Sequence, residues 1–244
     1  MKFKLIILAT LCFSLQSINA QWWSNGTKVE GNGTIKTENR SVGTYDEVNL
    51  SGFFDVILEQ GTEGNLTVQA ESNLLEYITT EVENNALKIS TKKGYNLRTS
   101  KRMQVIITVP FKDIDKVALS GSGDIIGKDL ITAKNFKALI SGSGDISLSV
   151  EAKTIETALS GSGDIKLTGT TDKLSAKVAG SGDISCYDLK AKDVEAKVNG
   201  SGDVEVYASK PLYARVSGSG DIDYKGNPAN VDKKTSGSGD VTAH

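Results

Sequence analysis

Apolar and polar residues alternate in short runs on both sides of a recurring Ser-Gly-Ser-Gly-Asp-Ile sequence. When the copies are aligned on their aspartates, mostly apolar residues stand seven and five positions before the aspartate and one and three positions after it. The residues between these positions are expected to point outward, because alternation with a period of two indicates strands that bury one face. A further apolar position lies about ten residues after each aspartate. Each unit is therefore predicted to contain two short strands around the bend, and a third.

The repeat fills the second half of the chain. Seven copies follow one another, and their aspartates, 18 to 21 residues apart, are Asp124, Asp145, Asp164, Asp183, Asp203, Asp221 and Asp240. A unit of about 20 residues cannot bury its own apolar face, so stacked copies must share one core. We expect an all-β protein, a right-handed parallel β-helix (solenoid) with about 20 residues per coil and a rise of ~4.8 Å per coil.

A degenerate eighth copy lies far upstream. It contains Asp55, with Phe53 and Phe54 in place of a serine and a glycine of the repeat. Asp55 and Asp124 are 69 residues apart, which predicts longer or irregular coils between these two copies. The strand-like runs of residues 66–110 are expected to form such wider coils, or a cap on the N-terminal end.

The first 20 residues have the pattern of a secretory signal peptide, with lysines before an apolar run and Ala20 at the expected cleavage site. Residues 21–40 are polar and rich in Gly, Asn and Thr, and are predicted to be a flexible leader. Residues 41–244 are predicted to be one β-helix domain, with irregular N-terminal coils or a cap in 41–118 and regular repeats in 119–244. We expect export to the periplasm or the outer cell surface, with no transmembrane segment in the mature chain.

Charge and composition argue against several classes of protein. The formal net charge is −2 and no nucleic-acid-binding motif is present, so no nucleic acid partner is expected. The only histidine, His244, is the last residue, which argues against histidine acid–base catalysis. A catalytic site should interrupt the repeat, whereas the columns stay regular, so we expect no enzymatic activity. The occurrence of polysaccharide-active enzymes among β-helices leaves that class as an alternative.

The column of seven aspartates is the first candidate site. Stacking would place neighbouring carboxylates ~5 Å apart, where each adjacent pair repels by about 0.8 kcal/mol in water. Serine hydroxyls, free backbone N–H groups of the bend, or outward lysines and arginines could offset this repulsion. Calcium bridging adjacent coils is the alternative, although one aspartate per coil supplies few of the 6–8 oxygens that calcium prefers. We therefore favour a structural bend and expect no other cofactor.

A basic stripe is the second candidate, formed by the outward residues Lys177, Lys197, Arg215 and Lys234. It could bind an acidic glycan or an anionic surface, or it could be a solvated face that balances the aspartates. The equivalent residues of earlier coils, Ala118, Leu139 and Ala158, could form an apolar contact face under the 66–110 segment. The last coil carries no recognisable cap, so self-association through the open end of the solenoid is also expected.

The opening Tyr45-Asp46-Glu47-Val48, the following Ser51-Gly52-Phe53-Phe54-Asp55-Val56 and the serial Ser-Gly-Ser-Gly-Asp-Ile copies resemble one bacterial family. This is the "putative auto-transporter adhesin, head GIN domain" family, a domain of unknown function, and the resemblance runs from Tyr45 to the C-terminus. It implies a right-handed parallel β-helix on exported proteins of the cell envelope, and it brings no catalytic residues. The expected function is a non-catalytic adhesion, binding or structural module whose partner is a surface glycan or an envelope protein.

Overall fold

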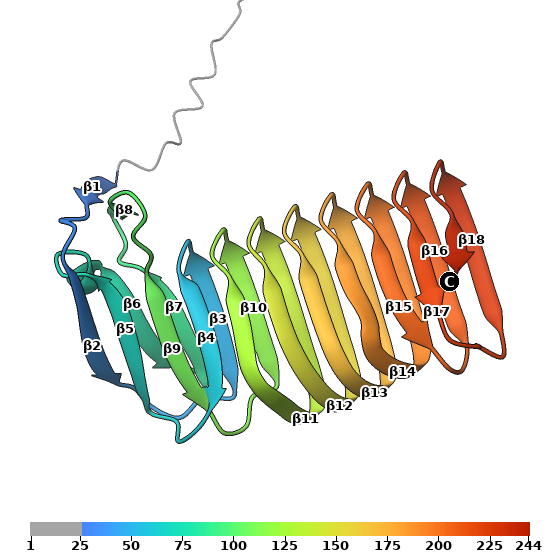
Figure 1. Cartoon of the computed structure of the whole chain (residues 1–244), viewed down its shortest axis with the longest axis horizontal. Helices are drawn as coiled ribbons and strands as arrows, with labels where there is room; N and C mark the ends of the chain where they lie inside the picture. The colour runs from blue at the N-terminus through green and yellow to red at the C-terminus, as the bar shows by residue number, and fades with distance from the viewer. Residues whose placement is uncertain (1–25) are drawn as a thin grey trace, which may run out of the picture.

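The computed structural model describes residues 26–244, which form one elongated stack of β-coils (Figure 1). The predicted signal peptide and residues 21–25 of the predicted leader lie outside the described residues. Within residues 26–244 the helical structure is one 3-10 turn, η1 (Leu75–Tyr77). None of the described helical segments is long and apolar enough to cross a membrane. The expected parallel β-solenoid is confirmed.

The regular coils lie in the second half of the chain. The strands, in chain order, are β10 (Lys116–Gly121), β11 (Ile125–Gly142), β12 (Ile146–Gly161), β13 (Ile165–Gly180), β14 (Ile184–Gly200), β15 (Val204–Ala208), β16 (Leu212–Gly218), β17 (Ile222–Lys225), β18 (Val231–Gly237) and β19 (Val241–Ala243). All of their pairings are parallel, and equivalent residues pair across coils, as in Ile146 with Ile165. The columns predicted by the alignment are therefore physical columns along the axis.

Each coil has two inward-facing runs and two corners. In β12, Ile146 to Val150 bury every second side chain, and Ile155 to Leu159 do the same in the opposite phase. The phase changes at a corner, which we call the far corner: residues 132–135, 151–154, 170–173, 190–193 and 208–211. The opposite corner is the Ser-Gly-Ser-Gly-Asp turn, which we call the bend ridge, at the upper edge of Figure 1. We call the sheet after the ridge the outbound sheet and the sheet before it the return sheet.

The prediction of a separate third strand in each coil is wrong. The apolar residue about ten positions after each aspartate, such as Ile155, begins the run that leads into the next bend. The long strands β11 to β14 pass through the far corner without interruption, because side-by-side copies of the corner can still pair their backbones. Two faces per coil are enough to enclose the core.

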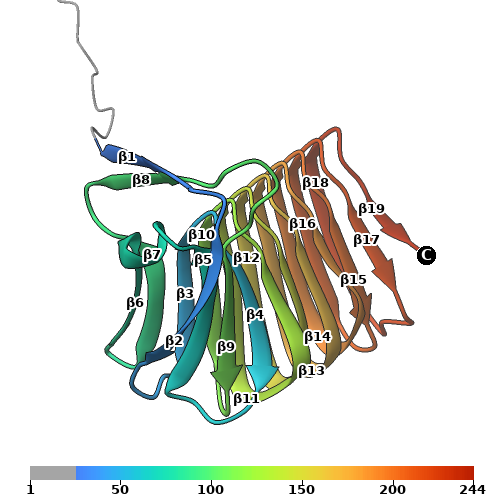
Figure 2. The same ribbon diagram turned by 60° about the vertical axis from the view of Figure 1, so that its left-hand side comes forward.

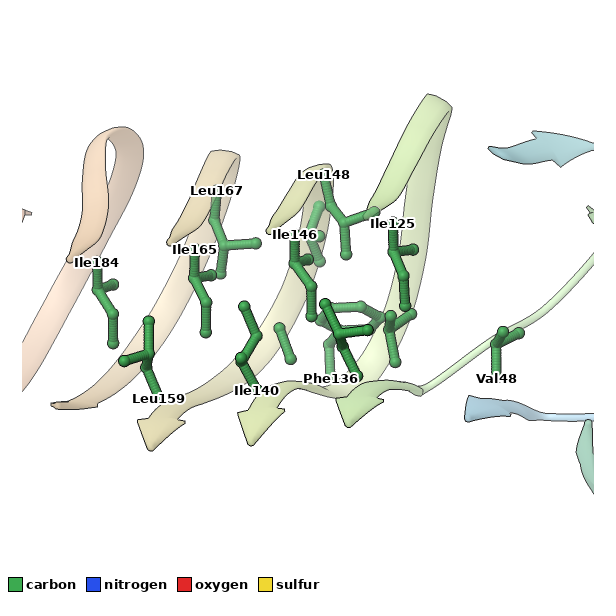
Figure 3. Close-up of a cluster of buried hydrophobic side chains, with 14 of the residues drawn as sticks. Val48, Ile125, Phe136, Ile140, Ile146, Leu148, Leu159, Ile165, Leu167 and Ile184 are labelled. Atoms are coloured by element: carbon green, nitrogen blue, oxygen red, sulfur yellow. The ribbon is translucent and has the colours of Figure 1, made fainter. Parts of the chain in front are cut away.

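The core is a double row of aliphatic side chains between the two sheets (Figure 3). One row contains Ile125, Ile146, Ile165 and Ile184, and the facing row contains Ile140 and Leu159, all no more than 3% exposed. Burying each such side chain contributes roughly 1.5–3 kcal/mol. Cys186 lies in the same interior, and burial raises the pKa of its thiol to about 12, so it is an inert core residue.

Glycine at the bend ridge allows the coils to nest. A Cβ on Gly163 would lie 2.0 Å from the carbonyl oxygen of Gly144 in the preceding coil. Gly161 has a φ of +137°, a backbone conformation that other L-residues rarely adopt. The first requirement is steric and the second is conformational, so both glycines of the turn are needed.

The N-terminal part adds strands out of sequence order. They are β1 (Thr27–Glu30), β2 (Ile35–Ser41), β3 (Glu47–Gly52), β4 (Asp55–Gln60), β5 (Asn65–Glu71), β6 (Ile78–Glu83), β7 (Ala86–Thr91), β8 (Tyr95–Arg98) and β9 (Ile106–Phe111). β3 and β4 form the Asp55 coil, which pairs directly with β10 and β11. The expectation that longer or irregular coils lie between the Asp55 and Asp124 copies is wrong, because these two copies are adjacent in space. The alternative, that the intervening residues form the N-terminal end of the stack, agrees with their place.

Residues 65–111 extend the stack on the other side of the Asp55 coil. β7 pairs in parallel with β3, and β9 pairs in parallel with β4. Beyond them, β6 runs antiparallel to β7, and β5 runs antiparallel to both β9 and β2. Antiparallel strands end the coiled path, so this end of the stack differs from the repeat (Figure 2).

The prediction of a flexible leader is wrong for residues 27–40. β1 pairs with β8 in a separate two-stranded sheet, and β2 pairs with β5 along its whole length. These strands looked loose in the sequence because they are edge strands with mostly exposed, polar side chains.

A buried carboxylate holds this N-terminal end together. The Glu71 side chain is 0% exposed and accepts hydrogen bonds from the Gly33 amide (2.5 Å), the Ser100 amide (2.9 Å) and the Ser100 hydroxyl (2.6 Å). Burial alone would raise the pKa of Glu71, but the hydrogen bonds from Ser100 and Gly33 outweigh it and hold the pKa below its usual value. Glu71 thus joins the loop after β1 to the loop after β8.

The last coil has an inward-pointing charge. Lys233 pairs with Ala214 and occupies the column that is apolar or small in the preceding coils. Its ammonium group donates a hydrogen bond to the carbonyl oxygen of Val241 (3.1 Å). An inward charge at a terminal strand discourages another chain from pairing there. This arrangement weighs against the expected self-association through the C-terminal end.

Candidate binding surfaces

The aspartates of the bend ridge form a continuous ladder of hydrogen bonds. Each aspartate Oδ1 accepts the backbone N–H of the aspartate one coil further on, with N···O distances of 2.7–3.3 Å from Asp55 to Asp240. In the last coil, Asp240 Oδ1 instead accepts the N–H of its own neighbour Val241 (2.7 Å). Of the three groups that could offset the carboxylate repulsion, the backbone N–H groups of the bend are therefore the ones engaged.

The ladder has a direct electrostatic explanation. Neighbouring carboxylates one coil apart repel by about 0.8 kcal/mol, and a net hydrogen bond to a charged acceptor contributes roughly 1.5–3 kcal/mol. The hydrogen bond therefore outweighs the repulsion between neighbouring carboxylates, even when partial solvent exposure reduces the contribution of the hydrogen bond. At the N-terminal end of the ladder, burial raises the pKa of Asp55, and the negative charge of Asp124 adds to that shift.

Geometry gives the ladder little capacity to hold a cation by itself. Among residues 26–244 no group of three or more His, Cys, Asp or Glu side chains is arranged to hold a metal ion. One oxygen of each aspartate already accepts a backbone N–H, which leaves one free oxygen per coil. Calcium binding by Asp124, Asp145, Asp164, Asp183, Asp203, Asp221 and Asp240 stays a prediction that needs a direct test.

The basic stripe lies on the outer face of the return sheet, as predicted, and three of its four residues form ion pairs, Lys234 forming none within residues 26–244. Lys177 lies 3.9 Å from Glu156, Lys197 lies 2.5 Å from Glu195, and Arg215 lies 2.6 Å from Asp232. The pKa values of Glu195 and Asp232 are lowered by these hydrogen-bonded partners. The stripe therefore neutralises acidic residues of the neighbouring outward column and not the aspartate ladder.

An apolar hollow lies on the same face, closer to the N-terminus. Ala118, Leu139 and Ala158 form its centre, in the column that becomes the basic stripe further along. The hollow has a volume of about 780 Å³, with Lys88, Lys116 and Lys177 on its rim and a row of bend-ridge serines along one side. The expectation that the 66–110 segment covers this face is wrong, because β7 extends the return sheet edge to edge instead of lying over it.

A row of lysines at the far corner is not visible when the repeat copies are aligned on their aspartates. Its members are Lys134, Lys153, Lys192 and Lys210, with Asp172 at the equivalent position of β13. Register shifts in the outbound sheet, such as the one between Cys186 and Lys190, vary the distance from each aspartate to this corner. Alignment on the next apolar column, which contains Ile155 and Leu174, would have aligned the row, since each member stands two residues before that column.

Comparison with known proteins gives a family and a set of similar structures. The family model described as "Putative auto-transporter adhesin, head GIN domain" matches residues 44–228. No curated protein matches the chain. Two crystal structures share the fold at moderate sequence identity. A putative adhesin from Bacteroides fragilis NCTC 9343 is 25% identical with a TM-score of 0.82, and the match covers 88% of this chain and 100% of that one.

The second structure is described as a putative lipid binding protein from Parabacteroides distasonis ATCC 8503. It is 29% identical with a TM-score of 0.74, and the match covers 89% of this chain and 100% of that one. A putative adhesin from Parabacteroides merdae ATCC 43184, at 22% identity and a TM-score of 0.74, shows the fold alone; the match covers 90% of this chain and 100% of that one.

Proposed function

Because the chain belongs to the putative auto-transporter adhesin, head GIN domain family, we propose that it is a non-catalytic binding module of the bacterial cell envelope or surface. The expected signal peptide would deliver it across the inner membrane. A straight stack of coils offers a long lateral surface, which suits contact with an extended or repetitive partner. The related structures described as adhesins support the same class of function.

The observation that carries this proposal is the apolar hollow around Leu139. Further along the same face, Lys137, Lys197 and Arg215 form ion pairs, whereas the hollow presents apolar side chains to solvent, and an apolar region of this kind is typical of a contact site. A volume of about 780 Å³ is large enough for a small ligand or for a protruding side-chain cluster of a partner. We infer that the ligand meets this module at the hollow.

Besides a surface glycan or an envelope protein, an acyl-bearing amphiphile is a candidate ligand of the hollow. The related structure described as a lipid binding protein favours it, as does the chemistry of the hollow. Alanine and leucine side chains would contact the hydrocarbon, while Lys88, Lys116 and Lys177 stand where an anionic head group would lie. Each buried CH₂ group would contribute about 0.8 kcal/mol.

Site-directed photo-crosslinking in the producing cells tests the proposal. A photo-reactive residue at Leu139 should give a discrete adduct, and mass spectrometry would identify it as protein, glycan or lipid. The matched control is the same residue at Ile126, an aliphatic position of β11 that is more exposed than half-buried Leu139 and lies on the outbound sheet. Adducts of equal yield at both positions, or none at Leu139, would refute the hollow as the binding site.

Two alternatives give different outcomes. A polysaccharide-active enzyme would release reducing ends from an acidic polysaccharide, whereas the proposed module leaves the polymer intact. A purely structural envelope module would give no adduct at Leu139, and its deletion would cause envelope defects.

A further inference from the structure

The two long corners of the solenoid carry opposite charge. The bend ridge presents the carboxylates of Asp55 and of the seven repeat aspartates, and its turns contain no basic residue. The far corner contains six lysines, at positions 134, 153, 173, 190, 192 and 210, against three carboxylates, at positions 151, 172 and 193. The charge is therefore divided across the width of the molecule although the net charge of the chain is only −2.

The lysines of the far corner stand in line along the solenoid axis. Lys134 and Lys153 lie side by side between paired neighbours of β11 and β12. Lys192 stands beside Asp172, and the amide of Lys210 donates to the carbonyl oxygen of Lys192 (3.0 Å). Successive coils are ~4.8 Å apart, so Lys134 and Lys153 form one closely spaced pair and Lys192 and Lys210 another, with Asp172 on the coil between the two pairs.

Three of the four lysines of the row form no ion pair within the described residues. Within residues 26–244, Lys134, Lys153 and Lys210 make no ion pair, and Lys192 pairs with Asp172 at 2.7 Å. In the basic stripe, Lys177, Lys197 and Arg215 are paired, and Lys234 forms no ion pair within residues 26–244. Cations without partners keep their charge available for an external anion.

A shallow trough accompanies the lysine row. It has a volume of about 560 Å³, and the small side chains of Ala133, Ala152, Thr171 and Ala191 form its floor. Lys153 and Lys192 stand on one side with Asp172 between them. Tyr207 stands on the other side with Glu151, and the Lys190 ammonium lies 3.9 Å from the Tyr207 ring centre. The trough runs along the axis, because its floor is a column of equivalent residues from successive coils.

We propose that the far corner binds a linear acidic polysaccharide laid along the solenoid axis. Carboxylates or sulfates of the polymer would meet the lysine pairs on either side of Asp172, and the sugar rings would lie in the trough beside Tyr207. A trough whose floor is a single column of residues along the axis fits an extended chain better than a flat membrane, which would contact only the outer edge of the corner. The proposal does not depend on the apolar hollow, which lies on a different surface.

Binding of the full chain to polygalacturonate, measured by isothermal titration calorimetry, tests the proposal. Polygalacturonate carries one carboxylate per sugar, and its fully methyl-esterified form is the uncharged control. The variant K134Q/K153Q/K210Q should bind at least tenfold more weakly than the parent chain. The matched variant K137Q/K197Q/K234Q removes the same charge from the return sheet, changes no residue of the hollow, and should change the affinity less than twofold. Raising the salt concentration should weaken binding of the parent chain more than of the corner variant.

Several outcomes would overturn this inference. Equal loss in both triple variants would mean a non-specific charge effect, and equal binding of the esterified polymer would exclude recognition of the carboxylates. Binding to phosphatidylglycerol vesicles with none to the polymer would assign the corner to a membrane surface instead. Because neither variant changes a residue that lines the hollow, crosslinking from position 139 should persist in both backgrounds, so failure of this inference leaves the proposed function standing.

Discussion

Two carboxylates show how the two ends of the molecule differ. Asp164 is exposed and accepts one backbone N–H from the next coil, and the same bond recurs along the whole ridge. Glu71 is buried and accepts three hydrogen bonds, from residues 29 and 38 positions away, in an arrangement that occurs once. The repeat part is thus stabilised by many equivalent interactions, each of which contributes little. The N-terminal end depends on a few interactions that do not recur along the described chain.

The largest expected effect comes from breaking the nesting of the coils. In Gly163→Ala the new Cβ would lie 2.0 Å from the Gly144 carbonyl oxygen, and neither backbone can yield without separating paired strands. We expect a loss of at least ~3 kcal/mol in the free energy of unfolding, measured by urea denaturation. Gly43→Ala is the control, since its Cβ would approach no atom closer than 3.9 Å and should change stability by less than about 0.5 kcal/mol. Equal stability of the two variants would contradict the nesting.

The second largest loss of stability is expected from replacing Glu71, the buried carboxylate of the N-terminal end. Glu71→Gln should cost about 2 kcal/mol, because three donors lose a charged acceptor. In the variant, the backbone amides of β2 and β5 should exchange faster than those of β12, since the lost hydrogen bonds lie at the N-terminal end. Uniform loss of protection along the whole chain would contradict the division into two regions.

The pH dependence of stability gives the same carboxylate a distinct signature. Its pKa is lowered in the folded state, so its contribution is present above the ordinary carboxyl pKa of about 4.3 and disappears as the pH falls through the lowered value. Protection of β2 and β5 should therefore decrease with acidification in the parent chain. In Glu71→Gln this component should be absent, and an unchanged acid dependence would show that another group is responsible.

A smaller effect is expected from one rung of the ladder. Asp164→Ala removes the acceptor of the Asp183 amide, at an exposed position where water can replace it. We expect a loss of about 1 kcal/mol in urea denaturation, and a smaller loss in Asp164→Asn, whose amide oxygen can still accept. A loss as large as that of Gly163→Ala would mean that the other hydrogen bonds of the ladder cannot maintain the stack when one is removed.

The smallest effect on stability, but a change of assembly, is expected at the C-terminal end. Lys233→Val restores an apolar residue to the inward column and removes the charge from the last coil. Stability should change by less than about 1 kcal/mol, while light scattering after size exclusion should show a concentration-dependent dimer. A monomer at all concentrations would show that Lys233 is not what protects this end.

The repeat part could be predicted from the sequence because its information is periodic. Each coil has the same apolar and polar positions, so aligning the copies predicts that Ile146 and Ile165 are neighbours in one column. The repeated glycines predict the turn that forms the bend ridge. The N-terminal end has no period: nothing in the sequence links Glu71 to Gly33 and Ser100, and edge strands such as β2 have the composition of a loose leader. The far-corner lysines were missed for a third reason, since register shifts displaced them from a column anchored on the aspartates.

The most direct test of the account is hydrogen exchange at the ladder amides with and without calcium. If the aspartates are acceptors for the bend backbone, the amides of Asp145, Asp164, Asp183, Asp203 and Asp221 should exchange slowly in the presence of a chelator. Adding millimolar calcium should leave those rates and the melting temperature unchanged. Fast exchange in chelator that becomes slow with calcium would contradict the account, because the ridge would then be a metal site that orders the coils.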